Sequence, residues 1–192
     1  MVDINQVKQW AISRWTLGET HGISHWERVE RNGLLLATPE CDVTVIRLFA
    51  YLHDSCREDD SYDEKHGPRA AKMIESLRET LLKDLSDEQF RMLQEACRLH
   101  TSTHRTGNPT IDACFDADRL DLGRVDIVPR PEKMATQKGK KIAARNLRKR
   151  GSYYWSFVSA NRIPKQHKSN QTLVFAHVVF YSGFSFTCGR NN

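Results

Sequence analysis

Apolar residues recur at helical spacing through the first 129 residues of this 192-residue chain, and strand-like alternation is absent from that region. Such spacing is typical of amphipathic helices, each of which buries one stripe of side chains against its neighbours. It leaves little room for a sheet, so we expect an all-α fold built around one shared core.

Start signals divide this region into six expected helices. A polar N-cap, a proline in the first turn or a capping box marks the start of a helix. The expected starts are Asp3, Ser24, Asp42, Pro68, the capping box Ser86–Gln89 and, for the last helix, Thr110. We expect the first helix to end near Gly18 and the last to run to Arg124.

Charge separates the chain into two unlike parts. Residues 1–129 carry 16 Lys and Arg against 23 Asp and Glu, whereas residues 130–192 carry 13 against 1. The sequence therefore predicts an acidic helical domain over 1–129 and a basic C-terminal extension over 130–192, in which 137–150 can form a surface helix. The overall pI near 9.0 is then no sign that the helical domain itself binds nucleic acid.

The cysteines and the N-terminus favour a cytoplasmic protein. The five cysteines are odd in number and never form a Cys-x-x-Cys pair, and the first residues lack the basic and apolar run of a secretory signal. The longest apolar stretch, 172–187, is shorter than the roughly 20 residues that span a bilayer. We expect reduced thiols and no membrane anchor.

Histidines and acids on the apolar helix faces need partners, because an unpaired buried charge costs several kcal/mol. A metal ion supplies such a partner. His25, the pair His53-Asp54, and Asp118 come from three expected helices. Two imidazoles and two carboxylates form a nitrogen and oxygen shell suited to a divalent ion such as Mn, Fe, Co, Zn, Ni or Mg.

In order along the chain, these four residues resemble the H…HD…D signature of the HD superfamily of metal-dependent phosphohydrolases. The flanking sequences are similar too: HWERV begins with His25, LHD contains the doublet, and DADRLD contains Asp118. The similarity covers about residues 20–125 and leaves the basic extension outside. It implies a helical bundle around one metal ion or two, which hydrolyses a phosphate ester or anhydride with metal-activated water.

The resemblance also implies roles for acidic residues. Asp54 is the ligand best placed to bridge two metals. Relatives carry an acid shortly after the doublet that orients the attacking water or takes its proton, and Glu58 is our first choice here. Its offset of four residues differs from the three in those relatives, and the alternative is a solvated acidic loop.

Four basic or imidazole side chains are candidates for binding substrate. His66 and His100 would complete a second metal site or bind the substrate phosphate. Arg28 and Lys65 would hold phosphates, because cationic donors are needed to position a polyanion. The alternative for Arg28 and Lys65 is that they are ordinary surface or salt-bridge residues.

Two functions stay open. The first is hydrolysis of a small phosphorylated substrate, with a nucleotide favoured. The second is nucleic-acid binding by the basic segment 138–168, where lysines and arginines alternate with Tyr153, Tyr154, Trp155 and Phe157 beside a non-catalytic HD core. The sequence leaves the oligomeric state open.

Overall fold

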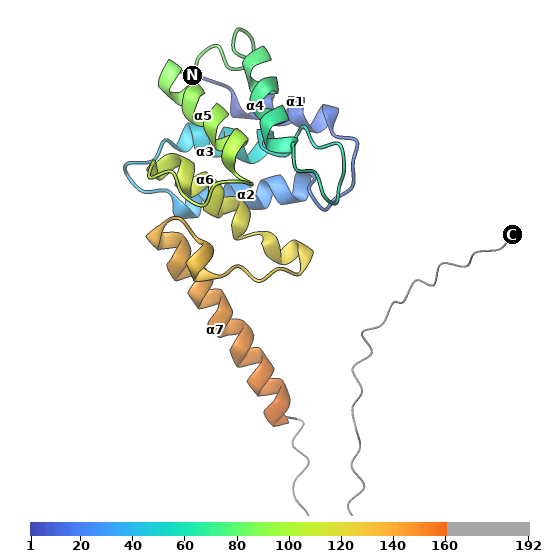
Figure 1. Cartoon of the computed structure of the whole chain (residues 1–192), viewed down its shortest axis with the longest axis vertical. Coiled ribbons are helices and arrows are strands. Elements are labelled where there is room, and N and C mark those ends of the chain that lie inside the picture. Colours follow the sequence, from blue (N-terminus) through green and yellow to red (C-terminus); the bar gives the residue numbers. More distant parts are fainter. Residues whose placement is uncertain (161–192) are drawn as a thin grey trace, which may run out of the picture.

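The computed structural model describes the backbone of residues 1–160 and the side chains of residues 1–149, and every regular element in that part is helical (Figure 1). The all-α prediction is therefore confirmed. The elements are α1 (Ile4–Arg14), α2 (Ile23–Leu36), α3 (Val43–Leu52), α4 (His66–Ser76), α5 (Asp87–Leu99), α6 (Pro109–Arg119), the 3-10 helices η1 (Leu122–Val125) and η2 (Pro131–Lys133), and α7 (Gln137–Ala160).

Three of the predicted helix starts are confirmed by their capping hydrogen bonds. Asp3 accepts from the backbone N–H groups of Asn5 and Gln6, and Asp42 accepts from that of Val45. Ser86 and Gln89 form the reciprocal capping box at the start of α5. These bonds satisfy amide groups that a helix leaves without partners at its N-terminus.

Other helix boundaries differ from the predictions. The N-cap of α2 is Gly22, and Ser24 lies inside the helix, where its hydroxyl donates to Glu19. α1 ends at Arg14 because Trp15 takes an extended conformation. The start of α4 lies two residues before Pro68, and η1 replaces the last turns expected of α6.

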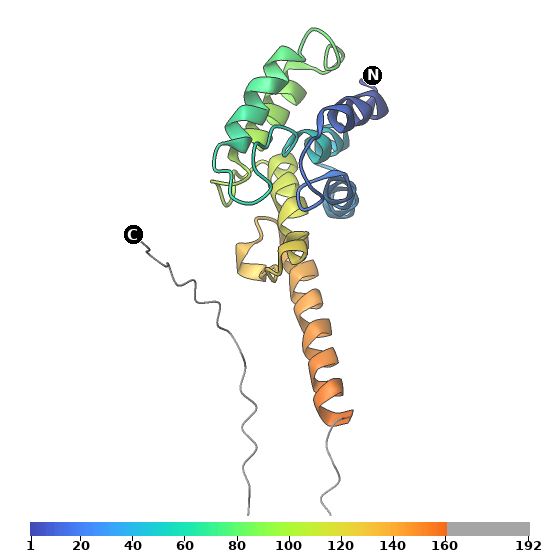
Figure 2. The ribbon, with the colours of Figure 1, turned by 90° about the vertical axis from the view of Figure 1, so that its right-hand side faces the viewer.

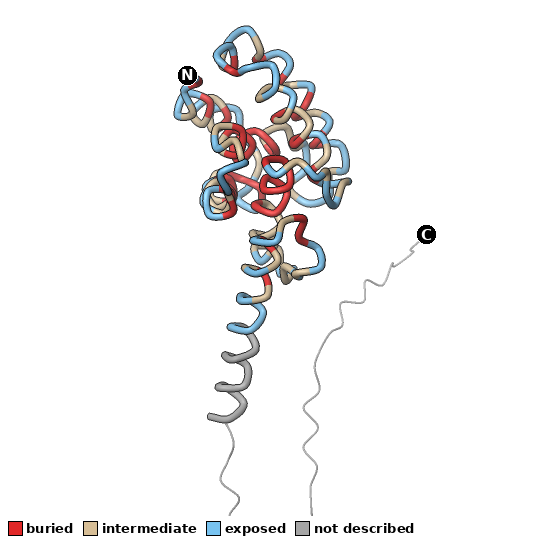
Figure 3. The backbone as a smooth tube through the Cα atoms, turned by 90° about the vertical axis from the view of Figure 1, so that its left-hand side faces the viewer, coloured by how far each residue is buried: buried red, intermediate tan, exposed pale blue. Residues whose placement is uncertain are grey.

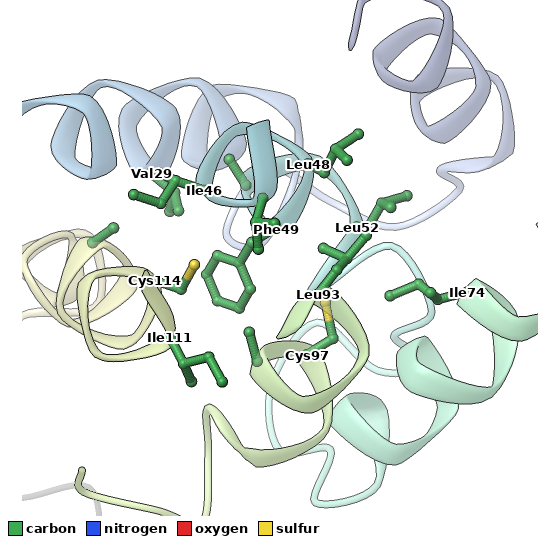
Figure 4. Close-up of a cluster of buried hydrophobic side chains, with 14 of the residues drawn as sticks. Val29, Ile46, Leu48, Phe49, Leu52, Ile74, Leu93, Cys97, Ile111 and Cys114 are labelled. Carbon is green, nitrogen blue, oxygen red and sulfur yellow. The ribbon is translucent and has the colours of Figure 1, made fainter. Parts of the chain in front are cut away.

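α3 is the central helix and contacts α1, α2, α5 and α6. Seven of its ten residues are buried. Phe49 lies in the middle of the apolar cluster that these helices share, beside Leu52 and Cys114 (Figure 4). Buried residues gather inside the bundle and become fewer along α7 (Figure 3). The core therefore fixes the two ends of α3 in space.

α7 begins against the bundle and then extends away from it (Figures 1 and 2). Its start is held by Asp116 of α6, which is fully buried. The Asp116 carboxylate accepts from the backbone N–H of Ala135 at 2.8 Å, and from both the N–H and the hydroxyl of Thr136 at 2.8 and 2.7 Å. Contacts thus cross residue 129, where the sequence predicts a domain boundary.

Replacing Asp116 with Ala should lower the free energy of unfolding by about 3 kcal/mol, because it leaves the buried amides without acceptors. Urea unfolding followed by circular dichroism measures this loss. Glu79→Ala, at an exposed position, is the control and should change the free energy by less than about 0.5 kcal/mol. A similarly small effect of Asp116→Ala would contradict the role assigned to this carboxylate.

The exposed basic residues of α7 fit the expected surface helix. Among residues 137–149, whose side chains are described, they are Lys138, Lys141, Arg145, Arg148 and Lys149. Nucleic-acid binding through 138–168 stays a prediction, and residues 161–168 lie outside the described part. Within residues 1–160, no helix has both the length and the apolar character needed to cross a membrane.

Candidate metal centre

Helix ends converge on a buried cluster of four histidines and two aspartates. Each comes from an element that the central helix holds in place, directly or through a neighbour. The cluster consists of His25 in α2, His53 and Asp54 at the end of α3, His66 at the start of α4, His100 at the C-cap of α5 and Asp118 in α6.

The first half of the cluster contains the four residues of the H…HD…D pattern. His25 Nε2 lies 3.2 Å from His53 Nε2, 3.5 Å from Asp54 Oδ2 and 3.4 Å from Asp118 Oδ1. His53 Nε2 lies 3.5 Å from Asp54 Oδ2 and 4.0 Å from Asp118 Oδ1. The structure thus brings together all four residues that the sequence proposes as metal ligands.

The second half faces the other oxygen of the same carboxylate. Asp54 Oδ1 lies 3.1 Å from His66 Nε2 and 3.8 Å from His100 Nε2, and the two Nε2 atoms are 2.8 Å apart. Asp54 therefore presents one oxygen to each pair of imidazoles. This arrangement gives His66 and His100 the geometry of a second ligand group, which the sequence left open beside phosphate binding.

The other ring nitrogen of each histidine is anchored. Nδ1 of His53 and of His100 lies 3.1 and 2.7 Å from the carbonyl oxygens of Phe49 and Cys97. His66 Nδ1 bonds the Asp63 carbonyl, and His25 Nδ1 lies 2.8 Å from Asp121 Oδ2. These oxygens can only accept, so each Nδ1 carries a proton, and in the neutral rings the Nε2 lone pairs face Asp54.

Such a convergence of lone pairs and carboxylate oxygens suits a bound cation. Donor atoms bound to one divalent ion at about 2.1 Å lie about 3.0 Å apart at right angles and about 3.4 Å apart in a tetrahedron. The separations in the first half span 3.2 to 4.0 Å. Within the described part of the chain, Asp118 Oδ1 is also buried without a hydrogen-bond partner. The residues present therefore fit a divalent metal ion.

Burial and the neighbouring charges shift the pKa values of His53 and Asp54. Complete burial lowers the pKa of His53 to about 3, so its imidazole is neutral over the physiological range. Burial alone would raise the pKa of Asp54, but attraction to the protonated forms of His53 and the other imidazoles outweighs burial and holds that pKa well below its ordinary value. Asp54 is thus ionised, as a carboxylate must be to bind a metal ion.

Metal binding should weaken in acid because a proton competes for His25. Burial opposes the charged imidazole, but hydrogen bonds with Asp121 and Asp54 prevail and raise the pKa of His25 above 6.5. Below that raised pKa, each unit of falling pH should weaken Mn²⁺ binding about tenfold. Calorimetric titration between pH 8 and 5.5 measures this slope. An affinity that stays constant over the range would contradict the assignment of His25 as a ligand.

The remaining predicted site residues lie outside the cluster. Arg28 Nε donates to Asp121 Oδ1 at 2.7 Å, so it supports the carboxylate that holds His25. Lys65 is exposed, at the N-cap of α4. The Glu58 side chain is 75% exposed and pairs with Arg69 at 3.5 Å, so the structure does not bring it to the cluster.

Two arginines that were not among the predicted site residues lie beside the cluster. The turn after Asp54 places Arg57, three residues later, where Glu58 was expected. Arg124 of η1 lies 3.8 Å from both Asp118 Oδ1 and Asp121 Oδ2. The three-residue offset from Asp54 was the available signal for Arg57, whereas nothing in the periodicity marked Arg124.

Of the comparisons with known proteins, the one with solved structures found a chain of similar architecture. No protein-family model matches the sequence, and neither does any curated protein. Among solved structures, the chain is similar to the crystal structure of a predicted HD superfamily hydrolase from an uncultured Thermotogales bacterium, with a TM-score of 0.65 and 22% identity over 82% of this chain and 90% of that one. This likeness confirms the HD-domain fold that the motifs predicted.

Proposed function

We propose that the protein is a metal-dependent phosphohydrolase, which cleaves a phosphate ester or anhydride of a small substrate, with a nucleotide as the favoured class. The observation that carries the proposal is the Asp54 carboxylate, whose two oxygens face two pairs of imidazoles. The similar structure, itself described as a predicted HD superfamily hydrolase, supports the same reaction class.

In this proposal His25, His53, Asp54 and Asp118 hold one divalent ion, and Asp54 with His66 and His100 holds a second. An ion bound there would lower the pKa of its bound water toward about 7. It would also supply positive charge that stabilises the negative charge on a phosphoryl oxygen. The anchored Nδ1 atoms fix the imidazole rings, so the ligands need little rearrangement when the ion binds. Asp121 orients His25, and Arg28 in turn orients Asp121.

A cavity of about 620 Å³ leads toward the second half of the cluster. Arg57 and His66 line both the cavity and the cluster. The rest of the cavity wall carries two basic residues, Lys65 and Arg98, and two acidic ones, Asp63 and Glu64. A volume of this size lies within the range of small-ligand pockets. It supports a substrate no larger than a nucleotide, with its phosphate turned toward His66.

Release of inorganic phosphate tests the proposal. The full chain, loaded with Mn²⁺, is offered nucleoside mono-, di- and triphosphates and sugar phosphates, and phosphate and pyrophosphate are measured. We expect release from one class of substrate, lost on chelation and restored by added Mn²⁺. Equal release by chelated and loaded protein would refute metal dependence, and the absence of release from the entire panel would count against the hydrolase.

A further inference from the structure

Arg57 is a buried cation whose guanidinium is only partly satisfied. Its side chain is 5% exposed. Nε donates to the carbonyl of Asp59 at 3.1 Å and Nη2 donates to that of Ser61 at 2.9 Å. Two backbone carbonyls of the same loop therefore fix the orientation of the guanidinium.

The third nitrogen of Arg57 points toward the metal centre. Nη1 lies 3.2 Å from His66 Nδ1, but that nitrogen carries the proton given to Asp63, so it cannot accept. The Asp54 Oδ1 contact is 3.5 Å long. Nη1 also lies 3.4 Å from His66 Nε2. This fixed donor therefore has only long contacts with possible acceptors, at 3.4 and 3.5 Å, and both acceptors belong to the second ligand group.

Arg124 repeats this arrangement beside the first ligand group. Its side chain is 10% exposed, and its Nε donates to the carbonyl of Thr20 at 2.8 Å. Among the described residues, buried Nη1 has no hydrogen-bond partner, and its ion-pair contacts with Asp118 Oδ1 and Asp121 Oδ2 are both 3.8 Å long. A buried cationic donor without an acceptor is costly, so the arrangement calls for an anionic ligand.

The charges around the centre balance before any metal binds. Three carboxylates, from Asp54, Asp118 and Asp121, lie close to three guanidinium groups, from Arg28, Arg57 and Arg124. With the histidines neutral, a divalent ion adds positive charge that these acids do not cancel. The loaded centre therefore attracts a dianion such as a phosphate group.

We propose that Arg57 and Arg124 bind the oxygens of the substrate's phosphoryl group, one arginine beside each ligand group. The inference rests on the proposed hydrolase function and adds to it the residues that bind the reacting phosphate. Guanidinium groups suit this task because they stay charged and offer directed donors to phosphate oxygens. Arg28 differs from both because its Nε pairs with the Asp121 carboxylate at 2.7 Å, whereas Nε of Arg57 and of Arg124 donates to a neutral backbone carbonyl.

Inorganic phosphate is the probe that tests the inference. Its affinity for the Mn²⁺-loaded full chain is measured by calorimetry for the wild type, Arg57→Gln and Arg124→Gln. The matched control is Arg91→Gln, which removes the same charge from an exposed position on α5. We expect each of the first two variants to bind phosphate about tenfold more weakly, the control to match the wild type, and Mn²⁺ binding to be retained in all.

Lysine variants keep the test decisive if a glutamine variant does not fold. Arg57→Lys and Arg124→Lys retain the charge but lose the fork, so phosphate affinity should still fall at least threefold. Phosphate affinity within twofold of wild type, in folded and Mn²⁺-loaded variants, would overturn the inference. That result differs from a failure of the proposed function, in which no substrate is hydrolysed although phosphate binding still depends on both arginines.

Discussion

Asp54→Asn should lower metal-dependent phosphate release by roughly 10³-fold or more, because the substitution removes the charge that both ligand groups share. Asparagine keeps the shape of the side chain, so the helices around it should stay in place. The Mn²⁺ affinity, measured by calorimetry, should fall in the same variant. Circular dichroism checks that the fold is retained.

Asp59→Asn is the matched control for Asp54→Asn. Asp59 lies on the same loop but is fully exposed, and its carboxylate bonds only with Ser61 among the described residues. Its replacement keeps the backbone carbonyl that binds Arg57, so Mn²⁺ affinity and phosphate release should stay near wild type. The account would be refuted by an Asp54→Asn protein that binds Mn²⁺ and releases phosphate at the wild-type rate.

Phe49→Ala should lower the free energy of unfolding by about 3–5 kcal/mol, since it opens a cavity in the middle of the core. The ring is fully buried and stacks on His53, with centroids 4.7 Å apart, and its edge meets His100 at 5.8 Å. Loss of the ring also removes support from one imidazole of each ligand group. Mn²⁺ affinity should therefore fall together with stability.

Two further variants separate the effect of Phe49→Ala from the effect of an ordinary substitution. Leu35→Ala removes a side chain that is 50% exposed on α2 and should lower the free energy of unfolding by less than about 0.5 kcal/mol. For Phe49→Leu, which leaves a smaller cavity, the loss of unfolding free energy should lie between those of Leu35→Ala and Phe49→Ala. Urea unfolding gives all three values. A loss below 1 kcal/mol for Phe49→Ala would contradict the central position of this ring.

The sequence allowed prediction of the residues whose signals are local. Apolar periodicity and the caps at Asp3, Asp42 and Ser86 predicted helices, since each depends on neighbours within one turn. The motif resemblance predicted which residues of separate helices would meet, and the structure brings His25, His53, Asp54 and Asp118 together. It also allowed the choice of Asp54 as the bridging carboxylate, an assignment that remains a proposal.

What the sequence could not supply lies in loops and long-range contacts. The loop after Asp54 has no periodicity, so apart from the three-residue offset nothing indicated that Arg57 would turn inward while Glu58 turned outward. Arg124 reaches the cluster only because η1 follows α6 after a turn that no sequence pattern predicts. Asp116 looked like part of the motif, yet its carboxylate holds the start of α7.

The central claim is that Asp54 joins two imidazole pairs into a metal centre, and crystals of the full chain soaked in Mn²⁺ test it most directly. Anomalous scattering locates bound manganese independently of any activity. The account predicts a peak among His25, His53, Asp54 and Asp118, and a second beside His66 and His100. Manganese that binds only elsewhere on the protein, with neither position occupied, would contradict it.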